Sequence, residues 1–209
     1  MSGARAEVLA RIGAALGEVP AAPVVPRGYR TAGASAPAGV VDLFCSRAAD
    51  YLATVRRVAE DDLADALADA CAERGTKRVV TAPGVATPRM PTVDIVRDSP
   101  DIPAASLGEF DAALTGCALA VAETGSIVLD GGPDSGRRAL TLGPDHHLCV
   151  VHADQVVAAV PAAVAALAGA ARDGRPITFV SGPSATSDIE LERVEGVHGP
   201  RKLDIVVVG

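Results

Sequence analysis

The amino-acid sequence predicts an α/β fold of three layers, in which a mostly parallel sheet is flanked by helices. Short, continuous apolar runs, which are typical of strands buried on both faces, recur along the chain. Segments with apolar residues at helical spacing lie between several of these runs, and such an alternation favours a parallel sheet. The length of 209 residues is sufficient for one substantial core.

Residues 1–42 are predicted to form a helix and an arm that precede this core. Residues 3–16 carry apolar side chains at the spacing of an amphipathic helix, namely Val8, Leu9, Ile12 and Leu16. Residues 17–39 are rich in proline, alanine, glycine and serine and show no period, so we expect an extended or mobile arm. The α/β domain is accordingly assigned to residues 43–209.

The domain is predicted to begin with a helix and a strand. Residues 46–58 are compatible with either a helix or a strand. From Asp61 the apolar residues recur at helical spacing, and this helix begins among acidic residues and ends at Gly75. Residues 78–82 follow as a strand that ends at a proline-glycine turn.

The second half of the chain contains the longest apolar runs. Residues 111–116 lead into residues 117–122, which are apolar throughout and predict a fully buried strand. Residues 126–130 alternate in polarity and predict a strand after a tight turn. The elements that follow are a glycine-rich loop at 131–136, a strand at 147–151, a turn at 154–157, a helix at 160–171 with Pro161 in its first turn, and strands at 177–180 and 203–208.

The composition excludes two classes of function. A nucleic-acid binder needs a basic face and aromatic platforms, whereas this chain has a net charge of −7, three Phe, two Tyr and no Trp. No apolar run approaches the roughly 18 residues of a membrane span. The N-terminal residues mix acidic and basic side chains and do not follow the pattern of a signal peptide. We therefore expect a soluble, cytoplasmic chain without a membrane span.

The four cysteines do not predict a metal site. Cys45, Cys71, Cys117 and Cys149 lie far apart, and the sequence contains no C-x-x-C motif or His/Cys cluster that is typical of zinc or iron–sulfur ligands. Cys117 and Cys149 lie in apolar runs and are interpreted as buried, reduced thiols. No resident cofactor is predicted, so iron–sulfur electron transfer would require a partner protein.

The first candidate site is the loop Glu123-Thr124-Gly125-Ser126, which follows a predicted buried strand. Open α/β sheets bind ligands beyond the carboxyl ends of their strands, and a glycine lets the backbone approach a ligand closely. Glu123 is a candidate general base, or a carboxylate nucleophile in acyl transfer, with Thr124, Gly125 and Ser126 as ligand-binding residues. An ordinary hairpin turn with a capping acid is the alternative interpretation.

The second candidate site is the segment 181–190. Backbone amides around Gly182, Ser184 and Thr186 are suited to an anion-binding concavity, and Asp188 either fixes these hydroxyls or caps a turn. The segment contains no nucleotide-binding motif of a standard type. The start of a helix is an equally good explanation of the hydroxyl and carboxyl residues.

Histidines form the third candidate group. His146, His147 and His152 lie together in the sequence, but adjacent strand residues face opposite sides, so His146 and His147 cannot readily ligate one ion. His198 lies in a loop next to Gly199, where its imidazole can contact an anion or exchange a proton near neutral pH. A solvated or backbone-bonded imidazole is the alternative.

Two arginines complete the candidates. Arg137 and Arg138 follow the glycine-rich loop, where they can close over a carboxylate or a phosphate group. A solvated pair of charges is the alternative interpretation.

Four motifs together resemble the LUD domain of the lactate-utilisation protein C (LutC/YkgG) family. They are residues 115–126, the sequence Pro144-x-x-His147, residues 181–190 and the turn Gly196-Val197-His198-Gly199-Pro200. The resemblance covers about residues 110–209, and Ser126 stands where threonine is commoner in this pattern. It implies a fold similar to that of ribose-5-phosphate isomerase, glucosamine-6-phosphate deaminase and the CoA transferases (the NagB/RpiA/CoA transferase-like fold).

The resemblance also implies a place in a bacterial system that oxidises L-lactate to pyruvate, together with two iron–sulfur partner proteins. A shared fold does not transfer an activity, so two hypotheses remain. In the first, the chain is an accessory or substrate-binding subunit whose loops bind lactate, pyruvate or a partner. In the second, it is an independent enzyme that acts on an acyl or phosphorylated molecule, with Glu123 as base or nucleophile and His198 among the residues that hold the anionic group.

Overall fold

The computed structural model describes residues 2–17, 24–26, 28–29, 39–87, 89–186, 194–195 and 199–209. The chain divides into two compact units, residues 1–30 and 31–209, and the predicted division after residue 42 stays a prediction. The described part of the first unit contains helix α1, Ser2–Leu16, which confirms the predicted N-terminal helix. Its apolar side chains, Val8, Leu9, Ile12 and Leu16, are exposed.

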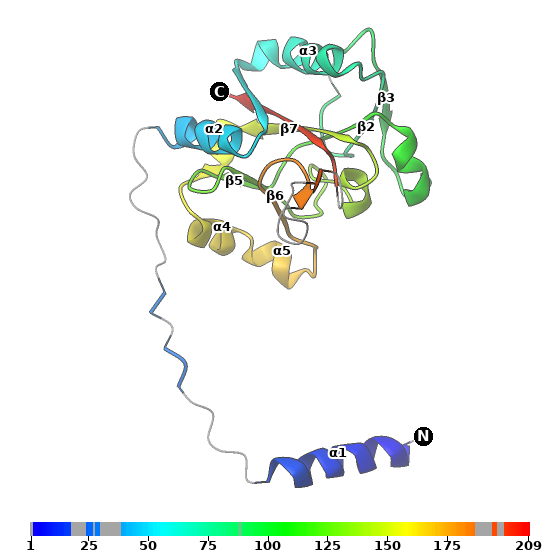
Figure 1. Ribbon diagram of the computed structural model, residues 1–209, viewed down its shortest axis with the longest axis vertical. Helices are drawn as coiled ribbons and strands as arrows, with labels where there is room; N and C mark the ends of the chain where they lie inside the picture. The colour runs from blue at the N-terminus through cyan, green and yellow to red at the C-terminus, as the bar shows by residue number, and fades with distance from the viewer. Residues whose placement is uncertain are drawn as a thin grey trace. The chain divides into compact units, whose positions relative to one another are not determined.

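The second unit is organised around a central sheet of six parallel strands (Figure 1). In spatial order the strands are β1 (Thr54–Val58), β12 (Lys202–Val208), β7 (His146–His152), β4 (Ala112–Thr115), β2 (Arg78–Thr81) and β3 (Asp94–Arg97). Every pair of neighbours in this sheet is parallel. The predicted α/β fold with a mostly parallel sheet is therefore confirmed.

A second, smaller sheet packs against the first and was not predicted. It consists of β8 (Val156–Val157), β5 (Leu119–Val121), β6 (Ser126–Leu129) and β9 (Thr178–Val180). β5 and β6 form an antiparallel hairpin, and β9 pairs antiparallel with β6. All four residues of β6 are buried instead of alternating, because both faces of this sheet are covered. Two short strands, β10 (Ala185–Thr186) and β11 (Val194–Glu195), form a further antiparallel pair.

The helices of the second unit correct two expectations. The ambiguous residues 46–58 contain both elements: the end of α2 (Val40–Asp50) and strand β1. Helix α3 (Leu63–Arg74) ends at Gly75 as predicted, but the helix expected at 160–171 is divided at Leu167 into α4 (Val160–Ala166) and α5 (Ala168–Arg172). The division follows from the backbone of Leu167, whose ψ of −1° departs from that of a regular α-helix. Short 3₁₀ helices are η1 (Glu60–Asp62), η2 (Ala104–Glu109), η3 (Arg138–Thr141) and η4 (Ala153–Gln155).

The core lies on both faces of the central sheet. Helix α3 packs on one face, with Leu67 and Cys71 against Leu148 and Val206. Helix α2 and the smaller sheet cover the opposite face, and α4 packs on the far side of that smaller sheet, as Figure 1 shows. No helix in the described part of the chain is long and apolar enough to cross a membrane.

Alternation along β7 and β12 determines which side chains face which layer. His146 and Asp204 lie on the α3 side of the sheet, whereas His147 and Leu203 lie on the side of the smaller sheet. The register pairs residue 146 with residue 202 and residue 147 with residue 203. Two adjacent histidines therefore belong to different environments.

Candidate functional site

A cavity of about 270 Å³ lies beside the amino ends of β7 and β12, between the central sheet and the segment that follows β9. One wall is formed by Arg138, Thr141 and His147. The other wall consists of residues 178–184 together with Gly199 and Pro200. We call this the Arg138 cavity. It brings together residues from the predicted arginine group, the histidine group and the segment 181–190.

Arg138 supplies a positive charge that has no acidic partner in the described part of the chain. Its Nη1 donates a hydrogen bond to Thr141 Oγ1 at 2.7 Å, and Thr141 is itself buried. Burial lowers the pKa of the Arg138 guanidinium because water is replaced without an opposing charge. Guanidinium groups remain cations at neutral pH, so this cavity contains a positive charge that no described acidic residue compensates.

His147 presents a neutral imidazole to the same cavity. The ring is 2% exposed, and its Nε2 lies 2.8 Å from Thr115 Oγ1. Burial, together with the nearby His146 and the charge of Arg138, lowers the pKa of His147 to about 3. At neutral pH the ring is therefore uncharged and acts as a hydrogen-bonding group, with one nitrogen as donor and the other as acceptor.

The wall that follows β9 is fixed by backbone contacts. Gly182 has a φ of +83°, and a Cβ at this position would clash with the carbonyl oxygen of Tyr51, so only glycine fits. The N–H of Ser184 donates to the carbonyl oxygen of Pro200 at 2.8 Å. This bond holds Ser184 beside Gly199 and closes the cavity on that side.

A chain of three hydroxyls connects this wall to the first predicted loop. Thr124 Oγ1 lies 2.7 Å from Ser126 Oγ, which in turn lies 2.6 Å from Ser181 Oγ in the cavity wall. Gly125, with a φ of +62°, packs against the backbone of Arg47 and Ala48 in α2. The structure thus connects Ser126 to the cavity through Ser181, although Ser126 does not line the cavity itself.

Glu123 does not follow a strand of the parallel sheet, which corrects the reasoning from the sequence. It is an exposed residue in the turn between β5 and β6, and these strands pair antiparallel within the smaller sheet. The argument from the carboxyl ends of parallel strands therefore does not apply to it. Glu123 is also not one of the described residues that line the Arg138 cavity. Its assignment as base or nucleophile stays a prediction.

Arg137 points away from the cavity that its neighbour lines. Its Nε and Nη2 bind the buried Asp98 at 2.9 and 2.8 Å, and Nη2 also donates to the carbonyl oxygen of Ile102. The charge of Asp98 raises the pKa of Arg137. The guanidinium is therefore occupied by an internal ion pair, and a ligand-binding role of Arg137 stays a prediction.

The remaining predicted residues are not described as lining the Arg138 cavity. Asp188 and His198 lie outside the described residues, and of Thr186 only the backbone, in β10, is described. His146 lies on the opposite face of the sheet, and His152 is exposed, 3.9 Å from Glu60. Within the described ranges no group of three or more His, Cys, Asp or Glu residues is suited to a metal ion. Cys117 and Cys149 are buried free thiols, as expected.

Several residues of the cavity were not identified from the sequence. From the sequence, His147 is only a rejected metal ligand and part of the motif Pro144-x-x-His147, although a polar residue at the start of an apolar strand also indicates a buried polar contact. Thr141 carries no signal that separates it from other hydroxyl residues. The motifs that contain Thr115 and Ser181 do not single these two residues out, because their importance depends on contacts between distant segments.

Comparison with known proteins agrees with this architecture. Residues 43–208 match the LUD domain. The chain is 48% identical over 173 residues to lactate utilization protein C from Deinococcus radiodurans, a match that covers 82% of this chain and 81% of the relative. It is 28% identical over 182 residues to the uncharacterized protein YkgG from Escherichia coli, covering 80% of this chain and 78% of that protein.

A solved structure is also similar. The crystal structure of a DUF162 family protein from Deinococcus radiodurans superimposes with a TM-score of 0.70 at 42% identity, covering 81% of this chain and 96% of that one. The region that matches the LUD domain contains the central sheet, the smaller sheet and the Arg138 cavity, since all of them lie within residues 43–208. The chain therefore belongs to the LUD domain family.

Proposed function

We propose that this chain serves in lactate utilisation as an accessory subunit that binds a small carboxylate in the Arg138 cavity. The observation that carries the proposal is the half-buried guanidinium of Arg138, which has no acidic partner in the described ranges. A relative that is 48% identical over most of the chain is named lactate utilization protein C, which supports the metabolic context. Lactate and pyruvate are small carboxylates of the kind that such a cavity accommodates.

The polar groups of the cavity are suited to different parts of such a ligand. The planar guanidinium of Arg138 presents donors that match the two oxygens of a carboxylate. The neutral ring of His147 can then hydrogen-bond the 2-hydroxyl of lactate or the 2-keto oxygen of pyruvate without adding a second charge. Such a site binds and orients the substrate, while electron transfer is assigned to iron–sulfur partner proteins.

An independent enzyme is the second candidate function, and one observation favours it. The hydroxyl chain of Thr124, Ser126 and Ser181 runs from the turn that contains Glu123 to the wall of the cavity. In this alternative, the ligand is an acyl or phosphorylated molecule and Glu123 acts as base or nucleophile. The two candidates differ in whether the isolated chain turns over a substrate.

Calorimetric titration of the full chain with L-lactate and with pyruvate tests the first proposal. An Arg138→Gln variant is expected to bind at least about tenfold more weakly, because hydrogen bonds to charged groups contribute about 1.5–3 kcal/mol. Arg172→Gln is the matched control, since Arg172 is exposed on α5 and does not line the cavity. This control is expected to bind like the unaltered chain.

Two results would decide against the binding subunit. Equal affinity in Arg138→Gln and the unaltered chain, or no binding of either carboxylate, would remove the proposed role of the cavity. The enzyme alternative is tested with acetyl-CoA and a sugar phosphate as substrates for the isolated chain. Turnover that Glu123→Gln abolishes would favour the enzyme, whereas a Glu123→Gln variant that still binds lactate normally fits the subunit.

A further inference from the structure

A second cavity of about 320 Å³ lies at the amino edge of the central sheet. Four strands of the sheet begin here, and its lining includes residues that immediately precede or start β2, β4, β7 and β12. It is on the α3 side, so β7 and β12 separate it from the Arg138 cavity. We call it the Lys202 cavity.

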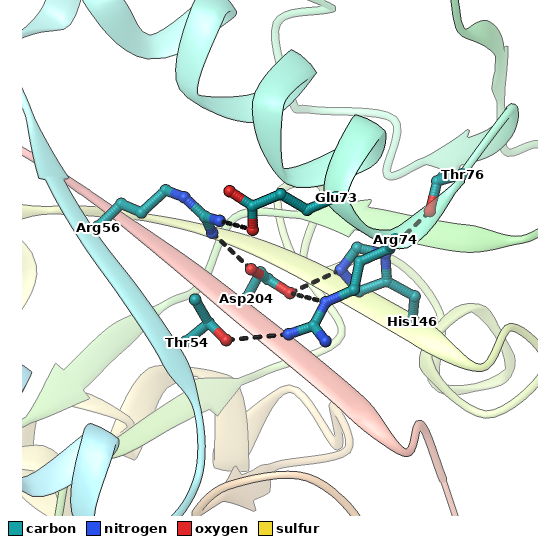
Figure 2. A network of polar contacts seen from close by, with 7 residues as sticks. All are labelled: Thr54, Arg56, Glu73, Arg74, Thr76, His146 and Asp204. Atoms are coloured by element: carbon teal, nitrogen blue, oxygen red, sulfur yellow. Dashed lines mark hydrogen bonds and ion pairs between the residues drawn. The ribbon is translucent and has the colours of Figure 1, made fainter.

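Figure 2 shows the polar network around Asp204, of which Arg74, Thr76 and His146 line this cavity. The carboxylate of Asp204 is fully buried and accepts hydrogen bonds from His146 Nε2 at 2.9 Å, Arg56 Nη1 at 2.5 Å and Arg74 Nε at 3.3 Å. These donors hold the pKa of Asp204 below its usual value, against the effect of burial. The charge of Asp204 is therefore met by internal donors, and Asp204 does not line the cavity.

The donors around Asp204 are fixed in turn by their other contacts. His146 Nδ1 lies 3.2 Å from Thr76 Oγ1, and Arg56 also forms an ion pair with Glu73. Arg74 uses a second nitrogen, Nη2, to donate to Thr54 Oγ1 at 3.0 Å. These contacts hold the side chains of Arg74, His146 and Thr76 in place at the wall of the cavity, as Figure 2 shows.

Two cationic groups at the cavity retain unused donors. The Nη1 of Arg74 forms no hydrogen bond within the described ranges, although Nε and Nη2 of the same guanidinium are occupied. The half-buried Lys202 has no hydrogen-bond or ion-pair partner for its ammonium group among the described residues. Both residues line the cavity, from the end of α3 and from the start of β12.

The two carboxylates at the cavity are already compensated. Asp111 accepts hydrogen bonds from the backbone N–H groups of Lys77 and Arg78, both at 2.8 Å, and these bonds lower its pKa. Asp145 binds Arg201 at 2.6 Å, and this contact, with a smaller contribution from the charge of Lys202, lowers the pKa of its carboxyl group as well. The donors of Arg74 and Lys202 thus remain for an external anion.

We propose that the Lys202 cavity is a second ligand site, which binds a phosphate or phosphate-monoester group between Arg74 and Lys202. Two cations that approach from different elements suit a tetrahedral dianion better than they suit the single charge of a carboxylate. The site is distinct from the Arg138 cavity, which has one guanidinium and lies on the other face of β7 and β12.

The chain contains only two lysines, Lys77 and Lys202, which makes a direct measurement practicable. Reductive methylation of the full chain with ¹³C-formaldehyde labels both side chains and keeps their charge, and a Lys202→Arg variant identifies the Lys202 signal. Titration with inorganic phosphate is expected to shift the Lys202 signal saturably. The signal of the exposed Lys77 is the internal control and is expected to stay in place.

Variants separate the two cavities. Arg74→Gln is expected to weaken the phosphate response of Lys202 about tenfold, whereas Arg138→Gln leaves it unchanged. If Arg74→Gln does not fold, calorimetry of a Lys202→Gln variant replaces it, with the same expected loss. A Lys202→Gln variant that loses phosphate but still binds L-lactate would confirm that the sites are independent, so failure of one proposal does not imply failure of the other.

Three results would overturn the proposal. The first is a Lys202 signal that does not move with phosphate. The second is a Lys202 signal that moves without saturation and in parallel with the Lys77 signal. The third is a Lys202 signal that L-lactate shifts more strongly than phosphate does. The second result would indicate a general ionic-strength effect, and the third would indicate a site for monocarboxylates.

Discussion

His146 and His147 are neighbours in β7, yet they belong to two opposite kinds of polar environment. His146 is part of a network in which the buried charge of Asp204 is met by three donors. His147 faces a cavity whose one guanidinium, Arg138, has no acidic partner in the described part of the chain. Both imidazoles are 2% exposed, so burial alone does not distinguish them.

The difference separates polar groups that hold the fold together from those that are available to a ligand. Removing one partner from a paired, buried charge is costly, because the remaining groups are left uncompensated. Removing a partly desolvated cation that has no acidic partner among the described residues takes away a group that is already unfavourable for folding. Substitutions in the Asp204 network should therefore lower stability. Substitution of Arg138 should instead lower ligand binding and leave stability unchanged or raised.

The largest effect is expected for Asp204→Asn. This change leaves Arg56 and Arg74 without their shared carboxylate, and we expect the free energy of unfolding to fall by about 3 kcal/mol, the lower end for a broken buried pair because both arginines are partly exposed. Urea denaturation followed by circular dichroism measures this loss. Asp42→Asn is the matched control, since the Asp42–Arg57 pair is exposed and should contribute about 1 kcal/mol or less. Equal losses in the two variants would show that the Asp204 network does not stabilise the fold.

The next effect depends on pH and arises from His147. Its pKa is about 3 in the folded chain and about 6.5 when unfolded, so below pH 6.5 the unfolded state takes up a proton that the folded state does not. The contribution of His147 to the free energy of unfolding is therefore complete above pH 6.5 and falls by about 1.4 kcal/mol per pH unit as the pH decreases towards 3. His147→Gln is expected to remove this part of the slope, which urea denaturation at pH 7, 6 and 5 measures.

The range from pH 5 to 7 isolates His147 from Asp204. The depressed pKa of Asp204 gives stability that is present above its unfolded value near 3.9 and is lost as the pH falls further. Asp204 therefore contributes little to the slope above pH 5. Identical slopes in His147→Gln and the unaltered chain would contradict a neutral, buried His147.

A smaller effect is expected where the hydroxyl chain meets the cavity wall. Ser126→Ala removes a buried hydroxyl that contacts both Thr124 and Ser181, and we expect a loss of about 1 kcal/mol in the free energy of unfolding. Thermal unfolding measures it, with Ser106→Ala as control, since the side chain of Ser106 bonds only to the carbonyl oxygen of Pro103 in its local turn. A loss no larger than that of Ser106→Ala would mean that the chain of hydroxyls does not hold the wall.

The sequence predicted the fold where the signal was local. Continuous apolar runs identified the strands at 117–122 and 203–208, and Gly75 identified the end of α3. The smaller sheet was not predicted, because an apolar run and a tight turn do not reveal which sheet a hairpin joins. Strand β3 was also missed, since it is an edge strand whose ends are charged.

The sequence indicated several residues of the candidate site, but not which of them lie together in the fold. Gly182, Ser184 and Arg138 were named from the sequence and line one cavity. Arg137 and Arg138 are identical in local pattern, and only the position of Asp98 after β3 decides which of them is occupied. Asp204, the one carboxylate in the last apolar strand, was a signal of a buried network that the sequence analysis left unused.

The smallest effect on stability is expected for Arg138→Met. Its sign distinguishes the Arg138 cavity from the Asp204 network. The change removes a partly desolvated cation that has no acidic partner in the described ranges, so stability should stay constant or rise by up to about 1 kcal/mol, whereas lactate binding should be lost. Arg56→Met on the opposite face is the counterpart and should destabilise the chain, because Asp204 would lose a donor. Urea denaturation of both variants, with calorimetry of the first, measures the contrast. A destabilised Arg138→Met that still binds lactate would place Arg138 with the groups that hold the fold together.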